Sequence, residues 1–227
     1  MNFTGADMSL TDILASRYSV RGFLPKPVPQ KELEDIFAAA QMSASNCNTQ
    51  PWQPLVVSGD KAKTVSSAML AEIMSGTAPY PDFEWNVKYQ DEHRTRQFGS
   101  ANALYSAMGI AREDKPARNM AMGRNWQFFG APHAIFFTME KYLGIMGAVD
   151  VGIYAQTLSL LMKERGIDSC MQGALGQFPG PVKEIFDVPE ERGILFGMSF
   201  GYADPDHSAN QARTDRAPLG DSVRFES

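Results

Sequence analysis

The chain has 227 residues, of which 44% are hydrophobic and 21% charged, and its net charge is −5. This length and balance are typical of one globular domain and exclude a disordered chain. A negative net charge without any block of lysine or arginine argues against nucleic acid as a partner. We recognise neither an apolar run of membrane-spanning length nor a secretion signal, so membrane insertion and export are not expected.

Cysteine and histidine are too few and too scattered to suggest a disulfide framework or a metal site. Cys47 and Cys170 lie far apart in the sequence. The three histidines, His93, His133 and His207, show no ligand spacing. We therefore expect no bound metal and a cytoplasmic location.

In the first half of the chain, the apolar spacing predicts helices and one short strand. Ser9 and Asp12 have the spacing of a loose capping box, and Asp60 is expected to cap a later helix. Residues 76–85 are rich in proline and aromatic residues and lack any period, so we interpret them as an excursion from the main body, and residues 76–96 as a substrate lid. The expected elements are helices at 9–16, from 29 to about 40 and at 60–75, with a buried strand at 55–57.

The second half contains the clearest strand and the strongest helix. Residues 134–138 are expected to form a central strand. Ile135, Phe136 and Phe137 are apolar at successive positions, as in a strand that is covered on both faces. Residues 147–165 have a strong helical pattern. The tail, residues 203–227, has no period and is expected either to be disordered or to wrap something else. One face of the strong helix carries Val149, Ile153, Gln156 and Leu160. Further helices are expected at about 91–112 and from a cap at Asp114 towards 129, with strands from about 167 and at 194–202.

Neither an internal repeat nor a linker divides the chain. We therefore expect residues 1–227 to form a single domain. The mixture of elements predicts an α+β fold in which many helices surround a short sheet.

Two pairs of arginines are open to two interpretations. Arg17 and Arg21 flank Tyr18 and Ser19 just after a helix, where cations simply suit the helix C-terminus. They could equally form an anion site, because guanidinium groups offer forked donors to phosphate and carbonyl oxygens. Arg213 and Arg216 are by default part of a solvated tail, yet two arginines at this spacing also suit a dianionic phosphate.

Two further segments have a polar or glycine-bearing pattern. Residues 43–52 form a dense run of hydroxyl and amide side chains, which is either a plain turn or an edge that binds a heterocycle. Residues 172–176 follow an expected strand and contain Gly173 and Gly176. Small residues there either form an ordinary loop or allow a backbone N–H group to approach a ligand closely.

Residues 197–201 match G-x-S-x-G, the nucleophile elbow of serine hydrolases. That motif requires a strand, a sharp turn and a helix, whereas these residues look like one continuous strand. We therefore interpret Ser199 as a strand residue, and a hydrolase remains a distant alternative.

Taken in order, these segments resemble the nitroreductase family. The resemblance rests on Arg-x-Ser-x-Arg at residues 17–21, Ser-x-x-Asn-x-Gln-Pro-Trp at 45–52 and Arg-x-x-Arg-Ala-Pro at 213–218. Residues 125–132 and 201–206 look like the branch that contains nitrobenzoate and nitrobenzene reductases. The resemblance implies an α+β sandwich with a central mixed sheet, an intertwined homodimer whose tails embrace the partner, and FMN at the interface.

The resemblance also implies roles for individual residues. Arg21, at the pyrimidine end of the flavin, and Gly173, whose N–H group would approach flavin N5, are the expected catalytic positions. Phe83, Tyr89 and Arg94 are expected to line the slot of the aromatic acceptor. The expected FMN-binding residues are Arg17, Tyr18, Ser19, Arg21, Gln172, Gly173, Ala174, Arg213 and Arg216, together with Ser45, Asn46 and Asn48 from the other subunit.

The implied activity is a two-electron reduction of nitroaromatic or related small aromatic compounds. Electrons would come from NADH or NADPH through FMN in a ping-pong cycle. The chain has neither a G-x-G-x-x-G nor a Walker motif, so the nicotinamide would bind only transiently. A family member that performs reductive dehalogenation or heterocycle dehydrogenation would share every motif, and the sequence does not choose between NADH and NADPH.

Overall fold

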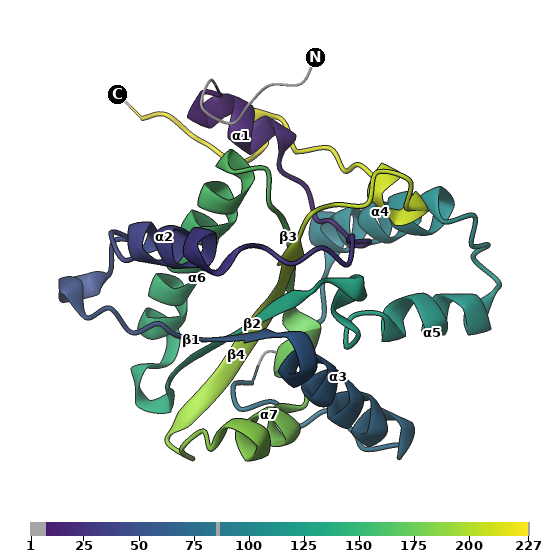
Figure 1. Cartoon of the computed structure of the whole chain (residues 1–227). Helices are drawn as coiled ribbons and strands as arrows, with labels where there is room; N and C mark the ends of the chain where they lie inside the picture. The colour runs from purple at the N-terminus through teal and green to yellow at the C-terminus, as the bar shows by residue number, and fades with distance from the viewer. Residues whose placement is uncertain (1–7, 85–86, 227) are drawn as a thin grey trace.

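The computed structural model describes residues 8–84 and 87–226. The beginning of the chain, the Trp85 end of the expected excursion and the last residue of the tail lie outside the described residues. The ends of the described chain lie at the periphery of the molecule (Figure 1).

A four-stranded sheet forms the centre, in the order β1 (Gln53–Ser58), β2 (His133–Glu140), β4 (Arg192–Gly201) and β3 (Asp168–Gln172). Among the described residues all three strand pairs are antiparallel, so the sheet of this chain is antiparallel and not mixed as expected. The chain reverses direction between β3 and β4, so β4 runs antiparallel beside β3. A parallel pair would instead need a crossover to the opposite end of the sheet.

Helices cover both faces of the sheet and confirm the expected α+β sandwich (Figure 1). On one face α2 (Gln30–Ala40) and α6 (Gly144–Glu164) pack against Ile135, Phe137 and Met139 of β2. On the other face α3 (Gly59–Met74) and α7 (Pro179–Phe186) pack against Ala134 and Phe136 of the same strand. Because both sides of β2 are covered, its sequence is apolar at successive positions, as expected.

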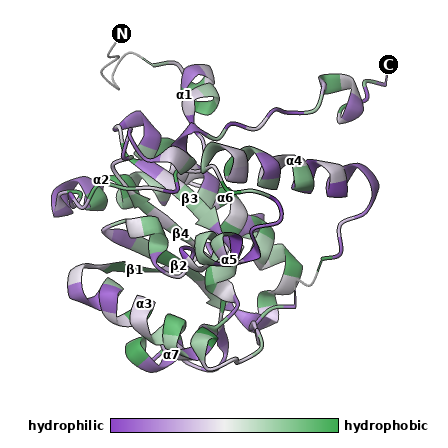
Figure 2. Ribbon diagram, turned by 90° about the vertical axis from the view of Figure 1, so that its right-hand side faces the viewer, coloured by the Kyte–Doolittle hydropathy of each residue, from purple (hydrophilic) through white to green (hydrophobic). Residues whose placement is uncertain are grey.

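The remaining helices lie outside this sandwich. Neither α4 (Asp91–Ala107) nor α5 (Lys115–Gly123) contains a buried residue, whereas α1 (Leu10–Ser16) buries Ile13. Beyond Asn210 the tail leaves the body as an extended segment (Figure 2). Short 3-10 turns occur at Asn46–Asn48 (η2), Phe128–Gly130 (η3), Lys141–Leu143 (η4), Gly173–Gly176 (η5), Ser208–Gln211 (η6) and Leu219–Asp221 (η7).

The first residues of the helices agree with two of the three predicted caps. Ser9 and Asp12 form the expected capping box on α1, and the Asp114 side chain accepts from the backbone N–H of Ala117 at the start of α5. Asp60 does not cap α3, because the helix begins one residue earlier and Ser58 occupies the N-cap position. The expected buried strand at 55–57 is an edge strand in which only Val57 is buried.

The face of α6 that carries Val149 and Ile153 does not pack into the core. Val149 and Ile153 are 52% and 41% exposed, while Val151, Tyr154 and Leu158 are buried against the sheet. Apolar residues occur on nearly every side of this helix, so their spacing alone does not identify the buried side. By length and hydropathy the stretch Lys141–Glu164 could also cross a membrane, contrary to the sequence prediction, although 44% of its most apolar window is buried within the fold.

The segment that follows α3 is attached to the body. The backbone N–H of Tyr80 donates to the carbonyl of Gln177, and the Asp82 carboxylate accepts from the N–H of Ile194 at 2.9 Å. Phe83 packs against Gly193 at the start of β4. The part of the expected lid up to Phe83 is therefore fixed to the sheet.

Candidate functional site

Six of the residues predicted to bind a cofactor line one cavity of about 870 Å³, which includes space open to solvent. Part of its wall comes from the segment that follows α1, and part from the tail. The side of α4 closes it with Ser100 and Leu104. The six predicted residues are Arg17, Tyr18, Ser19, Arg21, Arg213 and Arg216. We call this space the arginine cavity.

Asn210 joins the two segments that form the cavity. Its side chain is buried, accepts from the backbone N–H of Arg21 at 2.8 Å and donates to the carbonyl of Gly22 at 2.7 Å. The backbone N–H of Val20 donates to the carbonyl of Ser169, which fastens the first segment to β3. The part of the tail up to Asn210 is therefore an integral part of the fold.

The arginines of the cavity have no carboxylate partner in the part of the chain that the structure describes. The guanidinium of Arg213 lies 3.8 Å from the centre of the Tyr18 ring and donates to the carbonyl of Asn210. Arg216 donates to the carbonyl of Asp215. Because their charge is not neutralised by the protein, these side chains suit an anion with several oxygens, such as a phosphate.

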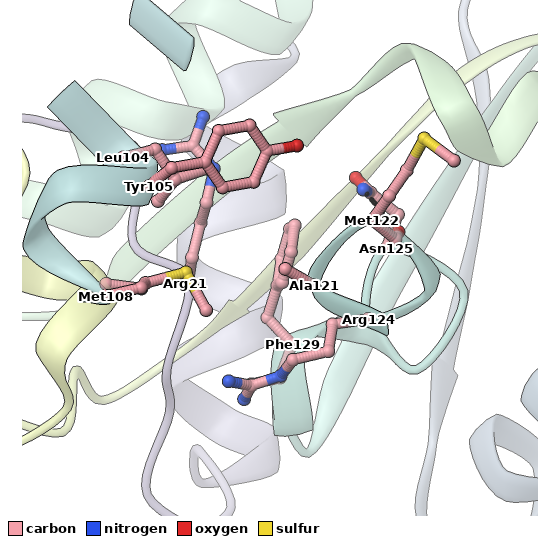
Figure 3. Close-up of a pocket in the computed structure, with 10 residues that line it drawn as sticks. Arg21, Leu104, Tyr105, Met108, Ala121, Met122, Arg124, Asn125 and Phe129 are labelled. Atoms are coloured by element: carbon pink, nitrogen blue, oxygen red, sulfur yellow. Dashed lines mark hydrogen bonds between the residues drawn. The ribbon is translucent and has the colours of Figure 1, made fainter. Parts of the chain in front are cut away.

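A second, smaller hollow of about 420 Å³ adjoins the arginine cavity and shares Arg21 and Leu104 with it. Figure 3 shows Tyr105 and Phe129 among the side chains that surround this space, together with the flexible thioethers of Met108 and Met122. An aromatic and thioether lining suits a flat apolar ring, with Arg21 at its polar border.

Arg124 also lines the smaller hollow, but its guanidinium contacts other groups of the protein. One nitrogen lies 2.5 Å from Nε2 of His207 and another donates to the carbonyl of Phe129. Burial lowers the pKa of Arg124, and burial together with the nearby Arg124 charge lowers the pKa of His207. The His207 ring is therefore neutral at pH 7 and supports the arginine.

Of the predicted residues at the end of β3, only Gly173 is exposed. The Gln172 side chain is buried, donates to Asn125 and accepts from Ser199, so it is not free to bind a ligand. The carbonyl of Ala174 accepts from the indole N–H of Trp126. The Gln172 side chain and the Ala174 carbonyl are therefore engaged within the protein, and the contacts of Gln172 and Ala174 with a cofactor stay predictions.

The loop with Ser45, Asn46 and Asn48 follows α2 and lies against α6, and it does not line the arginine cavity of its own chain. Phe83, Tyr89 and Arg94 line neither the arginine cavity nor the smaller hollow. Tyr89 is 48% exposed just before α4, and Arg94 lies over the ring of Phe98.

Sequence reasoning missed most of the residues that complete the two spaces. Leu104 and Tyr105 lie on α4 in a helical pattern without a distinctive motif, and Asn210 lies in a polar tail. Asn125, Phe129 and Thr214 fall within segments that carry the family resemblance, but they were not assigned a role there.

The serine hydrolase alternative is wrong. Ser199 is fully buried within β4, and its hydroxyl donates to the side-chain oxygen of Gln172. The motif continues as a strand, so it lacks the exposed nucleophile of a strand–turn–helix elbow. Among the residues that the structure describes, no group of three or more His, Cys, Asp and Glu side chains could hold a metal ion.

Comparison with known proteins agrees with this geometry. The model of the nitroreductase family matches residues 14–202. The nitroreductase NfnB of Mycolicibacterium smegmatis is 35% identical over 94% of this chain and 91% of its own, and a 4-nitrobenzoate reductase of Pseudomonas putida is 32% identical over 90% and 89%.

Solved structures extend the similarity to the fold. The crystal structure of the FMN-dependent NfnB of Mycobacterium smegmatis in complex with NADPH has a TM-score of 0.91 at 33% identity, covering 95% of this chain and 96% of that one. An FMN and NADPH-dependent NfnB from a Sphigopyxis strain has a TM-score of 0.93 at 31% identity, covering 97% of this chain and all of that one. The chain therefore belongs to the nitroreductase family.

Proposed function

We propose that this protein is an FMN-dependent NAD(P)H oxidoreductase that reduces nitroaromatic or related small aromatic compounds. The observation that carries the proposal is the arginine cavity, where four guanidinium groups surround a space and lack carboxylate partners among the described residues. The relatives support it, because they are described as nitroreductases or as a nitrobenzoate reductase, and the similar crystal structures as FMN-dependent and bound to NADPH.

The proposed roles follow from position. Arg213 and Arg216, at the outer side of the cavity, would hold the FMN phosphate, and Arg17 and Ser19 the polar chain next to it. Arg21 borders both spaces, so it would contact the polar edge of the flavin ring. Gly173 is exposed at the end of β3, where its backbone N–H group would approach the ring without a side chain in the way.

FMN, when bound, supplies two-electron redox chemistry, accepting hydride from a nicotinamide and later reducing the acceptor. The chain itself supplies binding, orientation and a positive charge beside the ring. We propose a ping-pong cycle in which both substrates use the same side of the flavin in turn. Tyr89, just before α4, and Arg94, near the start of that helix, are exposed and are proposed contacts of the acceptor. The anchored position of Phe83 argues for a supporting role instead.

We also propose that two chains form a homodimer. Four large apolar residues form an exposed stripe on α6, and burying such a stripe against a second copy removes it from water. The polar loop beside α6 would then face the FMN of the partner subunit. The tail would extend over the surface of the partner subunit. The stripe consists of Ile145, Met146, Val149 and Ile153, which are 82%, 54%, 52% and 41% exposed.

A cytoplasmic location is part of the proposal. Both cysteines, the exposed Cys47 and the buried Cys170, are free in the structure. Free thiols persist in a reducing compartment, where the nicotinamide cofactors are also used.

The first test is the visible spectrum of the purified protein, followed by anaerobic titration with NADH and, separately, with NADPH. We expect a bound flavin spectrum that bleaches on adding nicotinamide and returns on adding a nitroaromatic compound. Light scattering should give the mass of two chains. A colourless protein that does not take up FMN would overturn the proposal.

A further inference from the structure

The loop between α2 and β1 has an unfavourable backbone conformation. Cys47, Asn48 and Gln50 all have positive φ values, of 49°, 56° and 47°. For residues other than glycine this conformation costs free energy and persists only where the surroundings impose it. The loop tip is also exposed, so the surroundings must act on its two ends.

Asp150 of α6 holds the first end of the loop. Its side chain is buried, with the whole residue 4% exposed, and its two carboxylate oxygens accept from the backbone N–H of Asn46 at 3.1 and 3.2 Å. No lysine or arginine of the described chain forms an ion pair with it. A buried carboxylate is costly without partners, so its presence here favours a specific role over simple packing.

Tyr154, one helical turn further along α6, holds the second end. Its ring stacks on Trp52 with 4.7 Å between centroids and 8° between planes. Residues four apart in a helix lie on the same face, so Asp150 and Tyr154 act together on the two ends of the loop. The indole N–H of Trp52 donates to Gln41 at the end of α2, which completes the attachment.

An adjacent side of the same part of α6 carries the exposed apolar stripe, with Val149 and Ile153 next to Asp150 and Tyr154 in sequence. The loop therefore lies beside the surface that a second copy would cover. We propose that Asp150 is a positioning residue for the cofactor: it fixes the strained loop in the conformation in which Ser45, Asn46 and Asn48 bind the FMN of the partner subunit. This inference rests on the proposed function.

The experiment compares Asp150→Ala and Asp150→Asn with Asp82→Ala as the matched control. Asp82 is another buried aspartate that accepts from a backbone N–H group, that of Ile194, but it lies at the start of β4 and away from the loop. All three variants lose a buried carboxylate, so all three should lose stability. Only the Asp150 variants should alter the loop.

We expect Asp150→Ala to raise the Kd for FMN by about tenfold or more, because a strained loop released from its anchor must be ordered again on binding. The visible band of bound flavin should also change shape. Asp150→Asn keeps one oxygen that can accept from Asn46, so it should restore part of the affinity. Asp82→Ala should keep the parental Kd and band shape at a temperature where it is folded.

The outcomes separate the two levels of the argument. A parent protein that does not bind FMN overturns the proposed function itself. Suppose instead that the parent binds FMN, that Asp150→Asn leaves the Kd unchanged, and that Asp150→Ala leaves both the Kd and the band shape unchanged. This result would overturn the role of Asp150 alone. If Asp150→Ala fails to fold, an unchanged Kd and band shape in Asp150→Asn suffice to overturn it. An equal loss of affinity in Asp82→Ala would show that the effect is general destabilisation.

Discussion

The two ends of β4 carry two groups of charges that are organised in opposite ways. At its start, Asp82 lies 2.8 Å from the ammonium of Lys183 and 3.0 Å from that of Lys141, which also contacts Glu190 at 2.8 Å. We call this group the lysine–carboxylate cluster. Near the other end, the arginine cavity contains four cations and, among the described residues, no carboxylate paired with them.

This difference separates charges that stabilise the fold from charges that are available to a ligand. In the cluster the Asp82 side chain is only 6% exposed, and its partners neutralise it while it fastens the segment before α4 to the sheet. The hydrogen bond to Glu190 raises the pKa of Lys141, as expected for a cation that the protein itself pairs. Among the described residues, the arginines of the cavity contact carbonyl groups, the Thr214 hydroxyl and an aromatic ring, all uncharged, so their charge remains for an anion.

The largest expected effect is on the arginine side. Replacing both Arg213 and Arg216 by alanine removes two charge-assisted contacts of about 1.5–3 kcal/mol each, so the Kd for FMN should rise at least about a hundredfold. The melting temperature of the cofactor-free protein should change little, because neither side chain is paired with an acid. Fluorescence titration with FMN measures the affinity. An unchanged Kd would remove the tail from the binding site.

The opposite result is expected at the lysine–carboxylate cluster. Asp82→Ala leaves the ammonium groups of Lys141 and Lys183 with the exposed Glu190 as their carboxylate partner, and breaking a buried ion pair typically costs about 3–5 kcal/mol of folding free energy. Urea unfolding should show this loss, while the Kd for FMN stays at the parental value. A variant with parental stability would show that the cluster is not a structural anchor.

Arg21 tests whether an unpaired cation tunes the cofactor as well as binding it. Reduction places negative charge at the polar edge of the flavin, and a guanidinium there favours the reduced form. Arg21→Met keeps the bulk and removes the charge. If the contact is worth about 1.5–3 kcal/mol more in the reduced state, the potential should fall by about 30–60 mV. An unchanged or higher potential in an FMN-loaded variant contradicts the placement of Arg21.

The smallest expected effect is the pH dependence of stability that His133 causes. It tests whether the fold tolerates a further unpaired cation. Its Nε2 accepts from the N–H of Val28 and its Nδ1 contacts Ser58, so the ring is neutral, and burial lowers its pKa from 6.5. The unfolded chain therefore takes up the proton more readily than the folded one. Stability should be complete above about pH 6.5 and should fall as the pH drops below it.

Urea unfolding across this pH range measures the effect of His133. A His133→Gln variant keeps an acceptor and a donor but does not titrate, so its stability should depend less on pH. His207, whose pKa is also lowered, contributes in the same direction, and His207→Gln provides the matched comparison. Identical pH profiles of the parent and His133→Gln would show that His133 is not responsible.

The sequence by itself was enough for features that depend on neighbouring residues. The capping box of Ser9 and Asp12 and the Asp114 cap were predicted because the interacting atoms lie within three residues of each other. The apolar run of β2 was read correctly as a strand covered on both faces. The ordered motifs with Arg17, Arg21, Arg213 and Arg216 indicated the family and the residues that line the cavity.

Only the tertiary structure decided features that depend on which distant segments meet. The apolar pattern of α6 does not identify its buried side, because more than one side carries apolar residues, and packing on the sheet selects between them. The antiparallel sheet follows from the path of the connections. Asn210 and Asp150 bind backbone groups 189 and 104 residues away, and no local pattern announces such a partner. Hydrogen bonds over these separations exist only once the chain is folded, which is why the sequence indicated the arginines but not the residues that hold them in place.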